Sequence, residues 1–246
     1  MKEILWIPYR IYVLSFFFIT LIIVFLLMLM MQIFGDELKS KLVNNICKAW
    51  AKISLRAFFI RVKISGQENI DAKSSAIFVS NHRSYIDSAI LFYAIPKMFK
   101  PLGKAELGRI PVFGLIYKSV AIMVDRSSAF RRARSLKLLK RQLLRGVSVN
   151  LFPEGTFNTT DEPLIPFFNG AFKMAIETQT IIQPYIITGT QQVLHWKHAF
   201  KVYPGVIKVK YLPNVSPNNF SLQDIEKLKQ QVFEQMRAAL MDEGNW

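Results

Sequence analysis

The first hydrophobic pattern along the chain is an apolar run over residues 11–34 that contains no charged residue. Its polar members are Ser15, Thr20 and Gln32. A helix of this length can cross a hydrocarbon core of about 30 Å, so the run predicts an apolar membrane helix. It exceeds the apolar part of a signal peptide, and Gly35 with two acidic residues follows it instead of a small-residue cleavage site. We therefore expect the segment to be retained.

The second pattern, over residues 38–55, repeats at helical spacing. The expected apolar stripe consists of Leu38, Leu42, Val43, Ile46, Trp50 and Ile53. The opposite, polar and basic stripe consists of Lys39, Lys41, Asn44, Asn45, Lys48 and Lys52. Such a helix lies at a membrane interface or packs on a soluble domain. The adjoining apolar run favours the membrane, so residues 1–58 are expected to form a membrane-associated helical pair. Basic residues flank the apolar run on both sides, which leaves spanning and one-sided insertion open.

From residue 59 short apolar runs alternate with mixed helical segments. This rhythm predicts one α/β domain over residues 59–246, with a mixed sheet flanked by helices. The expected strands are residues 62–64, 76–80, 121–124, 147–152, 181–187 and 206–212. The expected helices are residues 85–95, 111–117, 129–145 and 170–178, and a last helix that opens at Ser221.

The last helix carries its own start signal. Ser221 followed by Asp224 three residues later is a variant of the capping box. The apolar stripe expected to be buried consists of Leu222, Ile225, Leu228, Val232, Met236 and Leu240. The pattern predicts an amphipathic helix that packs on the domain.

Composition narrows the classes of partner. The 246 residues include one cysteine, Cys47, which excludes an intrachain disulfide and fits a reducing compartment. The net charge of +15 implies an anionic partner, namely nucleic acid, an anionic membrane or a phosphorylated substrate. No nucleic-acid-binding motif accompanies the charge, so no nucleic acid is expected. His195 and His198 have no cysteine partner, so we interpret them as surface residues and expect no metal.

Eight of the basic residues lie between residues 126 and 145, where no acidic residue occurs. A solvated helix face is the ordinary fate of such a run. Next to a membrane helix, attraction to anionic lipid or to the phosphates of coenzyme A is an equally good interpretation.

Two short motifs stand where expected strands end, and the first contains His82 and Asp87. A histidine held at a strand end can act as a general base near neutral pH. A carboxylate five residues later can fix its tautomer and stabilise the imidazolium. His82 and Asp87 are therefore the candidate catalytic dyad, although a His-x4-Asp spacing can also arise by chance in a chain of this composition, so the motif is weak by itself.

The second motif is Phe152-Pro153-Glu154-Gly155-Thr156. Gly155 permits a tight turn at which backbone N–H groups can approach an anionic oxygen. Glu154 is either an acceptor for a substrate hydroxyl or an ordinary turn residue. Arg126, at the end of the strand expected over residues 121–124, has planar donors that suit a phosphate, although Asp125 is a ready partner.

In order and spacing, these motifs and Pro184 resemble the four conserved blocks of the lysophosphatidic acid acyltransferase family of glycerolipid acyltransferases. The resemblance covers most of residues 75–184 and includes the segments 104–107, 110–114 and 168–173. It implies His82 as the base on the acceptor hydroxyl and Asp87 as its orienting partner. The substrate-binding candidates, from the family roles and the neighbouring motif residues, are Asn81, Lys104, Arg126, Glu154, Gly155 and Thr156.

The resemblance implies transfer of a fatty acyl group from a thioester of coenzyme A or acyl carrier protein to a lysophospholipid hydroxyl. Lysophosphatidic acid, giving phosphatidic acid, is the first expected acceptor, and no cofactor beyond the thioester co-substrate is expected. The active site is expected to face the cytoplasm, at the inner membrane if the protein is bacterial. The family commonly has arginine where Phe157 stands, so another lysolipid such as a lyso-aminolipid is the alternative acceptor. A non-catalytic, membrane-tethered anion-binding protein is the remote alternative.

Overall fold

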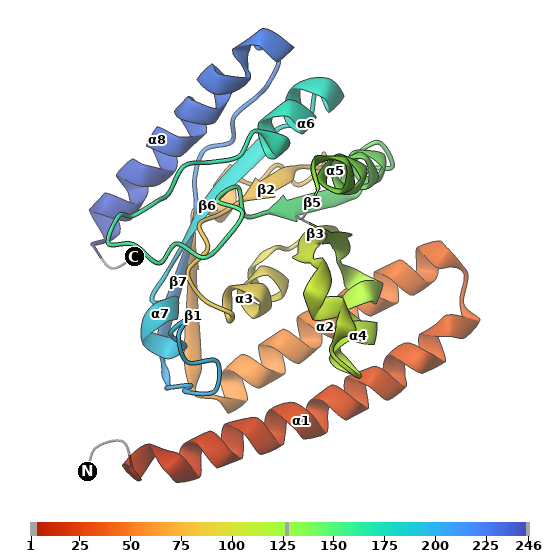
Figure 1. The fold of residues 1–246 in the computed structure, drawn as a ribbon, viewed down its shortest axis with the longest axis vertical. Helices are drawn as coiled ribbons and strands as arrows, with labels where there is room; N and C mark the ends of the chain where they lie inside the picture. Colours follow the sequence, from red (N-terminus) through yellow and green to blue (C-terminus); the bar gives the residue numbers. More distant parts are fainter. Residues whose placement is uncertain (1–3, 126–127, 245–246) are drawn as a thin grey trace.

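A seven-stranded sheet forms the centre of the computed structural model, which describes residues 4–125 and 128–244 (Figure 1). The strands are β1 (Ile60–Ser65), β2 (Ile77–Val79), β3 (Phe99–Lys104), β4 (Ile122–Val124), β5 (Ser148–Leu151), β6 (Ile182–Thr188) and β7 (Gly205–Tyr211). Their order across the sheet is β1-β7-β6-β2-β5-β3-β4. All neighbours are parallel except β6 and β7, which are antiparallel. The predicted mixed sheet is confirmed.

Helices cover both faces of this sheet. They are α1 (Ile7–Met30), α2 (Asp36–Ala57), α3 (Asp87–Ala94), α4 (Phe113–Val120), α5 (Ala129–Leu143), α6 (Gly170–Thr178), α7 (Thr190–Val193) and α8 (Ile225–Glu243). The side chains of β2 show this layering, because successive side chains of a strand point to opposite faces of the sheet. Ile77 and Val79 pack in a cluster with α5, α6 and α8, whereas Phe78 packs in a cluster with α2 and α3. Figure 1 shows α1 and α2 on the side of the sheet opposite α6 and α8.

The long N-terminal helix α1 is apolar on its buried and exposed sides alike. Val13 and Val24 are buried, whereas Ile19, Ile22 and Ile23 on the other side are more than half exposed. Within the described residues, the segment 7–33 is the one helix long and apolar enough to cross a membrane, and 22% of its most apolar stretch is buried. The apolar helix predicted over residues 11–34 is therefore present, with an outward face that water would not favour.

The second helix, α2, differs from its predicted pattern. Leu38 and Ile53, expected on its apolar stripe, are about half exposed. Asn44, expected on the polar stripe, is buried, and its side chain donates a hydrogen bond to the carbonyl of Phe99 at 3.1 Å. The reason is that α2 packs against α1, α3 and α4 together, so its buried face is set by three neighbours. Helix α2 therefore packs on the rest of the protein, and its position at a membrane interface stays a prediction.

The predicted boundary between residues 58 and 59 falls between α2 and β1. Val13 of α1 and Leu55 of α2 nevertheless belong to the apolar cluster that covers one face of the sheet. The division into an anchoring pair and a catalytic domain stays a prediction.

Three further details correct the expected elements. Strand β3 was not expected, because Pro101 and Gly103 interrupt its sequence. Helix α3 begins at Asp87, later than the predicted residue 85. At the last helix the capping box of Ser221 and Asp224 is confirmed, and a single 3-10 turn precedes α8. Leu222, expected in the buried stripe, lies in that turn and is 52% exposed.

Candidate functional site

The two motifs meet at one edge of the sheet. Strands β2 and β5 are parallel neighbours, so their carboxyl ends lie side by side. His82 follows β2 by three residues, and Phe152 follows β5 directly. Loops at the carboxyl ends of parallel strands are the usual place for a ligand site in α/β folds.

His82 and Asp87 form a hydrogen-bonded pair, with the imidazole Nδ1 2.8 Å from the Asp87 carboxylate Oδ2. The same Oδ2 accepts hydrogen bonds from the backbone N–H groups of Arg83 at 2.8 Å and Ser84 at 2.9 Å. Asp87 is 1% exposed, whereas the His82 side chain is 16% exposed. Because the carboxylate accepts from Nδ1, the proton of a neutral imidazole lies on Nδ1, and Nε2 is left as the acceptor.

The helical explanation for this pairing requires a correction. Asp87 was expected to reach back to His82 within the first turns of a helix. In the structure His82 lies before α3, and Asp87 is the first residue of that helix. A turn joins the two residues, and it is held by the backbone donors that converge on Asp87.

Aromatic rings pack on the imidazole. The ring of Phe152 stacks on His82 with centroids 3.7 Å apart and an interplanar angle of 6°. The centroid of the Phe157 ring lies 4.4 Å from that of the His82 ring and 4.8 Å from that of the Tyr85 ring. These contacts fix the plane of the imidazole, and they leave an apolar surface next to it.

Glu154 connects the second motif to the first. Its Oε1 accepts the backbone N–H of His82 at 2.9 Å, and its Oε2 accepts that of Ile165 at 3.3 Å. The residue is 1% exposed. Burial raises the pKa of Glu154 to about 8, against the lowering effect of its hydrogen bonds to His82 and Ile165. This carboxyl group is thus directed at the backbone of the site.

Asn81 is also directed at backbone. Its side chain donates to the carbonyl of Ile187 and accepts from the N–H of the same residue, both at 2.8 Å. It is 1% exposed. Asn81 therefore ties the residue before His82 to the end of β6.

Gly155 and Thr156 form the exposed side of the second motif. Gly155 has φ +70°, a conformation that favours glycine, and a Cβ there would lie 2.6 Å from the ring of Phe168. Its N–H closes the turn on the carbonyl of Phe152 at 3.0 Å. Thr156 is exposed beside it.

Two basic residues, Lys104 and Arg126, were predicted to bind substrate. Lys104 ends β3, which is parallel to β5, so it lies at the same edge of the sheet as the motifs. Its side chain is 53% exposed and its ammonium lies 4.0 Å from a carboxylate oxygen of Glu106. Arg126 lies outside the described residues. The neighbouring Asp125 pairs with Arg131.

Two residues that sequence reasoning missed hold the loop after the second motif. Asn158 is fully buried, and its N–H donates to the carbonyl of His82 at 2.7 Å. Arg83 is 6% exposed and donates to the carbonyls of Thr160 at 2.6 Å and Glu162 at 3.2 Å. Their place in the sequence was the available signal, because Arg83 lies inside the first motif and Asn158 lies two residues after the second. Once buried, such polar groups need specific partners.

No cluster of three or more His, Cys, Asp or Glu side chains that could hold a metal ion occurs in the described part of the chain. The rings of His195 and His198 are 6.1 Å apart. His198 is exposed and His195 is partly exposed.

The chain matches the model of the Acyltransferase family over residues 61–188, which is 128 of its 246 residues. It is 34% identical over 170 residues to a 1-acyl-sn-glycerol-3-phosphate acyltransferase of Limnanthes douglasii, covering 68% of this chain and 59% of that protein. It is 29% identical over 175 residues to 1-acyl-sn-glycerol-3-phosphate acyltransferase alpha of Mus musculus, covering 70% and 61%. The chain thus spans about three fifths of the length of these relatives.

The fold also matches a solved structure. The crystal structure of a 1-acyl-sn-glycerophosphate acyltransferase from Thermotoga maritima superimposes with a TM-score of 0.82. The match covers 100% of this chain and 99% of that chain, at 24% identity. At this identity the match establishes the fold.

Proposed function

Because this chain belongs to the Acyltransferase family, we propose that it transfers a fatty acyl group from an acyl thioester to the free hydroxyl of a lysophospholipid, with lysophosphatidic acid as the acceptor and phosphatidic acid as the product. The relatives described above, which are 1-acyl-sn-glycerol-3-phosphate acyltransferases, support this acceptor. The single observation that carries the chemistry is the hydrogen bond between His82 Nδ1 and Asp87 at the carboxyl edge of the sheet.

In the proposed reaction, Nε2 of His82 accepts the proton of the acceptor hydroxyl as its oxygen attacks the thioester carbonyl carbon. The buried Asp87 carboxylate stabilises the imidazolium that forms. Collapse of the tetrahedral intermediate breaks the carbon–sulfur bond, and the imidazolium returns the proton to the departing thiolate. The Gly155 N–H closes the turn on Phe152, so the remaining backbone N–H groups of this turn are the proposed donors to the oxyanion.

In this mechanism Glu154 and Asn81 act as positioning residues. Both are buried, and their hydrogen bonds to backbone atoms support a role in holding the His82 loop between β5 and β6. Lys104, Gly155, Thr156 and Arg126 stay the candidates for contact with substrate.

A membrane location supports a lipid acceptor. The exposed apolar face of α1 would lie in the bilayer, and residues of α1 share the cluster that contains Ile86 and Leu91, close to His82 in sequence. We propose that the protein is membrane-bound through α1, with the site facing the cytoplasm.

A second acceptor class is favoured by one observation. Phe157 stands where the family commonly has a cation, and its ring packs against His82. A lysolipid whose head group is not a phosphate monoester, such as a lyso-aminolipid, is therefore the alternative substrate.

The test uses membranes that contain the full chain, labelled acyl-coenzyme A or acyl carrier protein thioester, and a panel of lysolipids. His82→Ala is compared with His198→Ala, which removes an exposed histidine elsewhere. Acylation of lysophosphatidic acid that is lost only in His82→Ala supports the proposal. Transfer only to another lysolipid replaces the acceptor, and transfer that survives His82→Ala refutes the dyad.

A further inference from the structure

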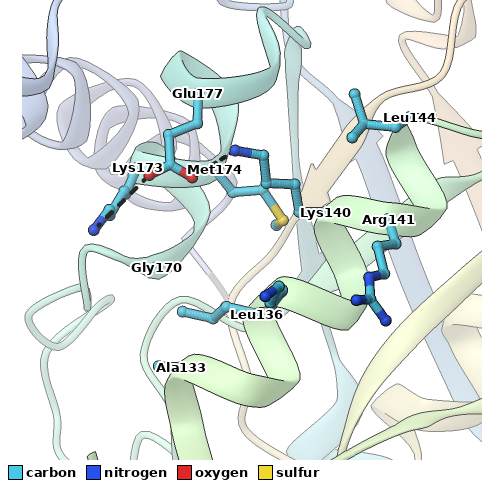
Figure 2. A pocket seen from close by; sticks show the side chains of 10 residues that line it. Ala133, Leu136, Lys140, Arg141, Leu144, Gly170, Lys173, Met174 and Glu177 are labelled. Carbon is cyan, nitrogen blue, oxygen red and sulfur yellow. Dashed lines mark hydrogen bonds and ion pairs between the residues drawn. The ribbon is translucent and has the colours of Figure 1, made fainter. Parts of the chain in front are cut away.

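A groove of about 410 Å³ lies between α5 and α6 (Figure 2). Its volume is in the range of small-molecule sites, which is roughly 300–1,000 Å³. Leu136 of α5 and Leu144, which follows α5 directly, give it apolar surface, whereas Met174 of α6 lines it but is only 3% exposed. Leu144 is 68% exposed, so its side chain is accessible to a ligand in the groove.

Cationic side chains surround this apolar surface. Lys137, Lys140, Arg141 and Lys173 line the groove, and Glu177 is the one acidic residue among the lining residues. Glu177 pairs with Lys140 at 3.1 Å and with Lys173 at 3.9 Å, as the dashed lines in Figure 2 show. Neither Lys137 nor Arg141 has an ion pair within the described part of the chain. The groove therefore has two uncommitted cations and a net positive charge.

The position of the groove distinguishes between the interpretations of the basic segment 126–145. The helices α5 and α6 cover the face of the sheet opposite the one that packs against α1 and α2 (Figure 1). If α1 lies in a bilayer, the groove faces away from it, which disfavours anionic lipid as its ligand. The hollow between two helices, lined by cations of both, favours a bound anion over a merely solvated helix face. A soluble ligand with phosphates and a flat apolar group fits both features.

The groove also leads toward the site. The edge of the sheet at which the carboxyl ends of β2 and β5 lie is called the catalytic edge here. Helix α5 follows β4 and precedes β5, and α6 precedes β6, so each helix runs from the catalytic edge to the opposite edge. The groove ends near the catalytic edge at Gly170, two residues after Phe168. The N–H of Phe168 donates to the carbonyl of Pro153 at 2.8 Å, and its ring packs on the Gly155 turn. An extended chain leaving this end of the groove therefore passes the second motif.

We propose that the groove between α5 and α6 binds the phosphoadenosine end of coenzyme A, so that acyl-coenzyme A is the donor; this rests on the proposed acyl transfer. The adenine packs on Leu136, and the phosphates bind Lys137 and Arg141. The pantetheine arm runs past Phe168 to the site. The water-soluble donor and the lipid acceptor then approach from opposite faces of the sheet and meet at His82.

The test measures binding of coenzyme A to the full chain in phosphatidylcholine nanodiscs, with adenosine 3′,5′-bisphosphate as competitor. Arg141→Glu is compared with Arg145→Glu, which makes the same charge change four residues later, just after α5, at a residue that does not line the groove. Since both residues are exposed, neither change should disturb folding. We expect the Kd for coenzyme A to rise at least tenfold in Arg141→Glu and less than twofold in Arg145→Glu. The KM for acyl-coenzyme A should rise by the same factor, with kcat unchanged.

The proposal is overturned if both variants weaken binding equally, because the effect would then be general electrostatics. It is also overturned if adenosine 3′,5′-bisphosphate does not compete, or if Arg141→Glu weakens binding to anionic vesicles or acyl carrier protein but not to coenzyme A. Acyl transfer from acyl-coenzyme A with a KM that Arg141→Glu leaves unchanged would overturn the groove and leave the proposed function intact. Arg141-dependent binding of coenzyme A without acylation of any lysolipid would overturn the proposed function instead.

Discussion

Replacing Asp87 by asparagine tests the dyad most directly. In the protein one carboxylate oxygen accepts three N–H groups, from His82 Nδ1, Arg83 and Ser84, at 2.8–2.9 Å. The single carbonyl oxygen of asparagine can occupy the same place and keep the three contacts. The change therefore removes the negative charge while largely preserving the geometry.

The expected magnitudes differ for stability and catalysis. A hydrogen bond to a charged group contributes about 1.5–3 kcal/mol and a neutral one about 0.5–1.5 kcal/mol. Weakening of the two backbone hydrogen bonds to residue 87 would then lower the free energy of unfolding by about 2 kcal/mol. Part of this loss is offset, because a neutral amide costs less to bury than a carboxylate at a site that is 1% exposed. The bond to His82 matters when the imidazolium forms, and general-base catalysis contributes about 10²–10⁴-fold in rate. We expect kcat to fall by about 10³-fold, or ~4 kcal/mol of transition-state stabilisation.

The assay measures kcat and KM for acyl transfer in the wild type, Asp87→Asn, His82→Ala and the double variant, with urea unfolding of each. If the two residues act as a unit, the double variant is no slower than His82→Ala alone. Asp87→Asn with more than a tenth of the wild-type kcat would refute the reasoning. The reasoning would also be refuted if the fold-reduction in kcat of the double variant equalled the product of the reductions in the two single variants.

Three other changes test separate features. Gly155→Ala should lower the free energy of unfolding by about 1–3 kcal/mol more than Gly146→Ala in urea melts. Both glycines have positive φ, but only a Cβ at Gly155 meets a ring, so equal losses would contradict the contact with Phe168. In the wild type the free energy of unfolding should fall as the pH rises from about 5 to 8, and Glu154→Gln should abolish this fall. Burial raises the pKa of Glu154 to about 8, so the folded state keeps a proton that the unfolded state releases across this window, and parallel pH curves would count against it. Aspartates at Ile22 and Ile23, in the middle of the exposed face of α1, should each cost about 2.5–3.5 kcal/mol of insertion and release the chain on carbonate washing. Full retention would argue that α1 is not the anchor.

The parts of the fold that follow strong periodic patterns could be predicted from the sequence. The mixed sheet, the long apolar helix and the capping box of Ser221 are examples. Strand β3 could not, because Pro101 and Gly103 are typical of loops and only the neighbours β4 and β5 make them part of a ladder. The buried face of α2 was misjudged for a similar reason, since tertiary neighbours outweighed the amphipathic pattern.

At the candidate site, the spacing of His82 and Asp87 predicted their pairing only together with the second motif and the family resemblance, and by a helical turn that the structure replaces with a loop. The supports of that loop were not predictable. Glu154 reaches the backbone of His82 across 72 residues of chain, and Asn158 reaches its carbonyl. Contacts of side chains with backbone carry no pattern in the sequence, because any residue supplies the same N–H and C=O groups.

Phe157 shows how a departure from the family pattern changes the chemistry of the site. Its ring packs against His82 and Tyr85, so apolar surface lies where the family commonly has a cation. A phosphate on the acceptor must then find its positive charge outside the second motif. Lys104 lies at the same edge of the sheet, and its ammonium is 4.0 Å from Glu106, a distance at which the carboxylate competes only weakly in water. Charge recognition and proton abstraction would thus be assigned to different strands, β3 for the head group and the loop after β2 for the hydroxyl. If lysophosphatidic acid is the acceptor, we therefore expect the strand ends around His82 to recognise its head group more than the motif that follows β5.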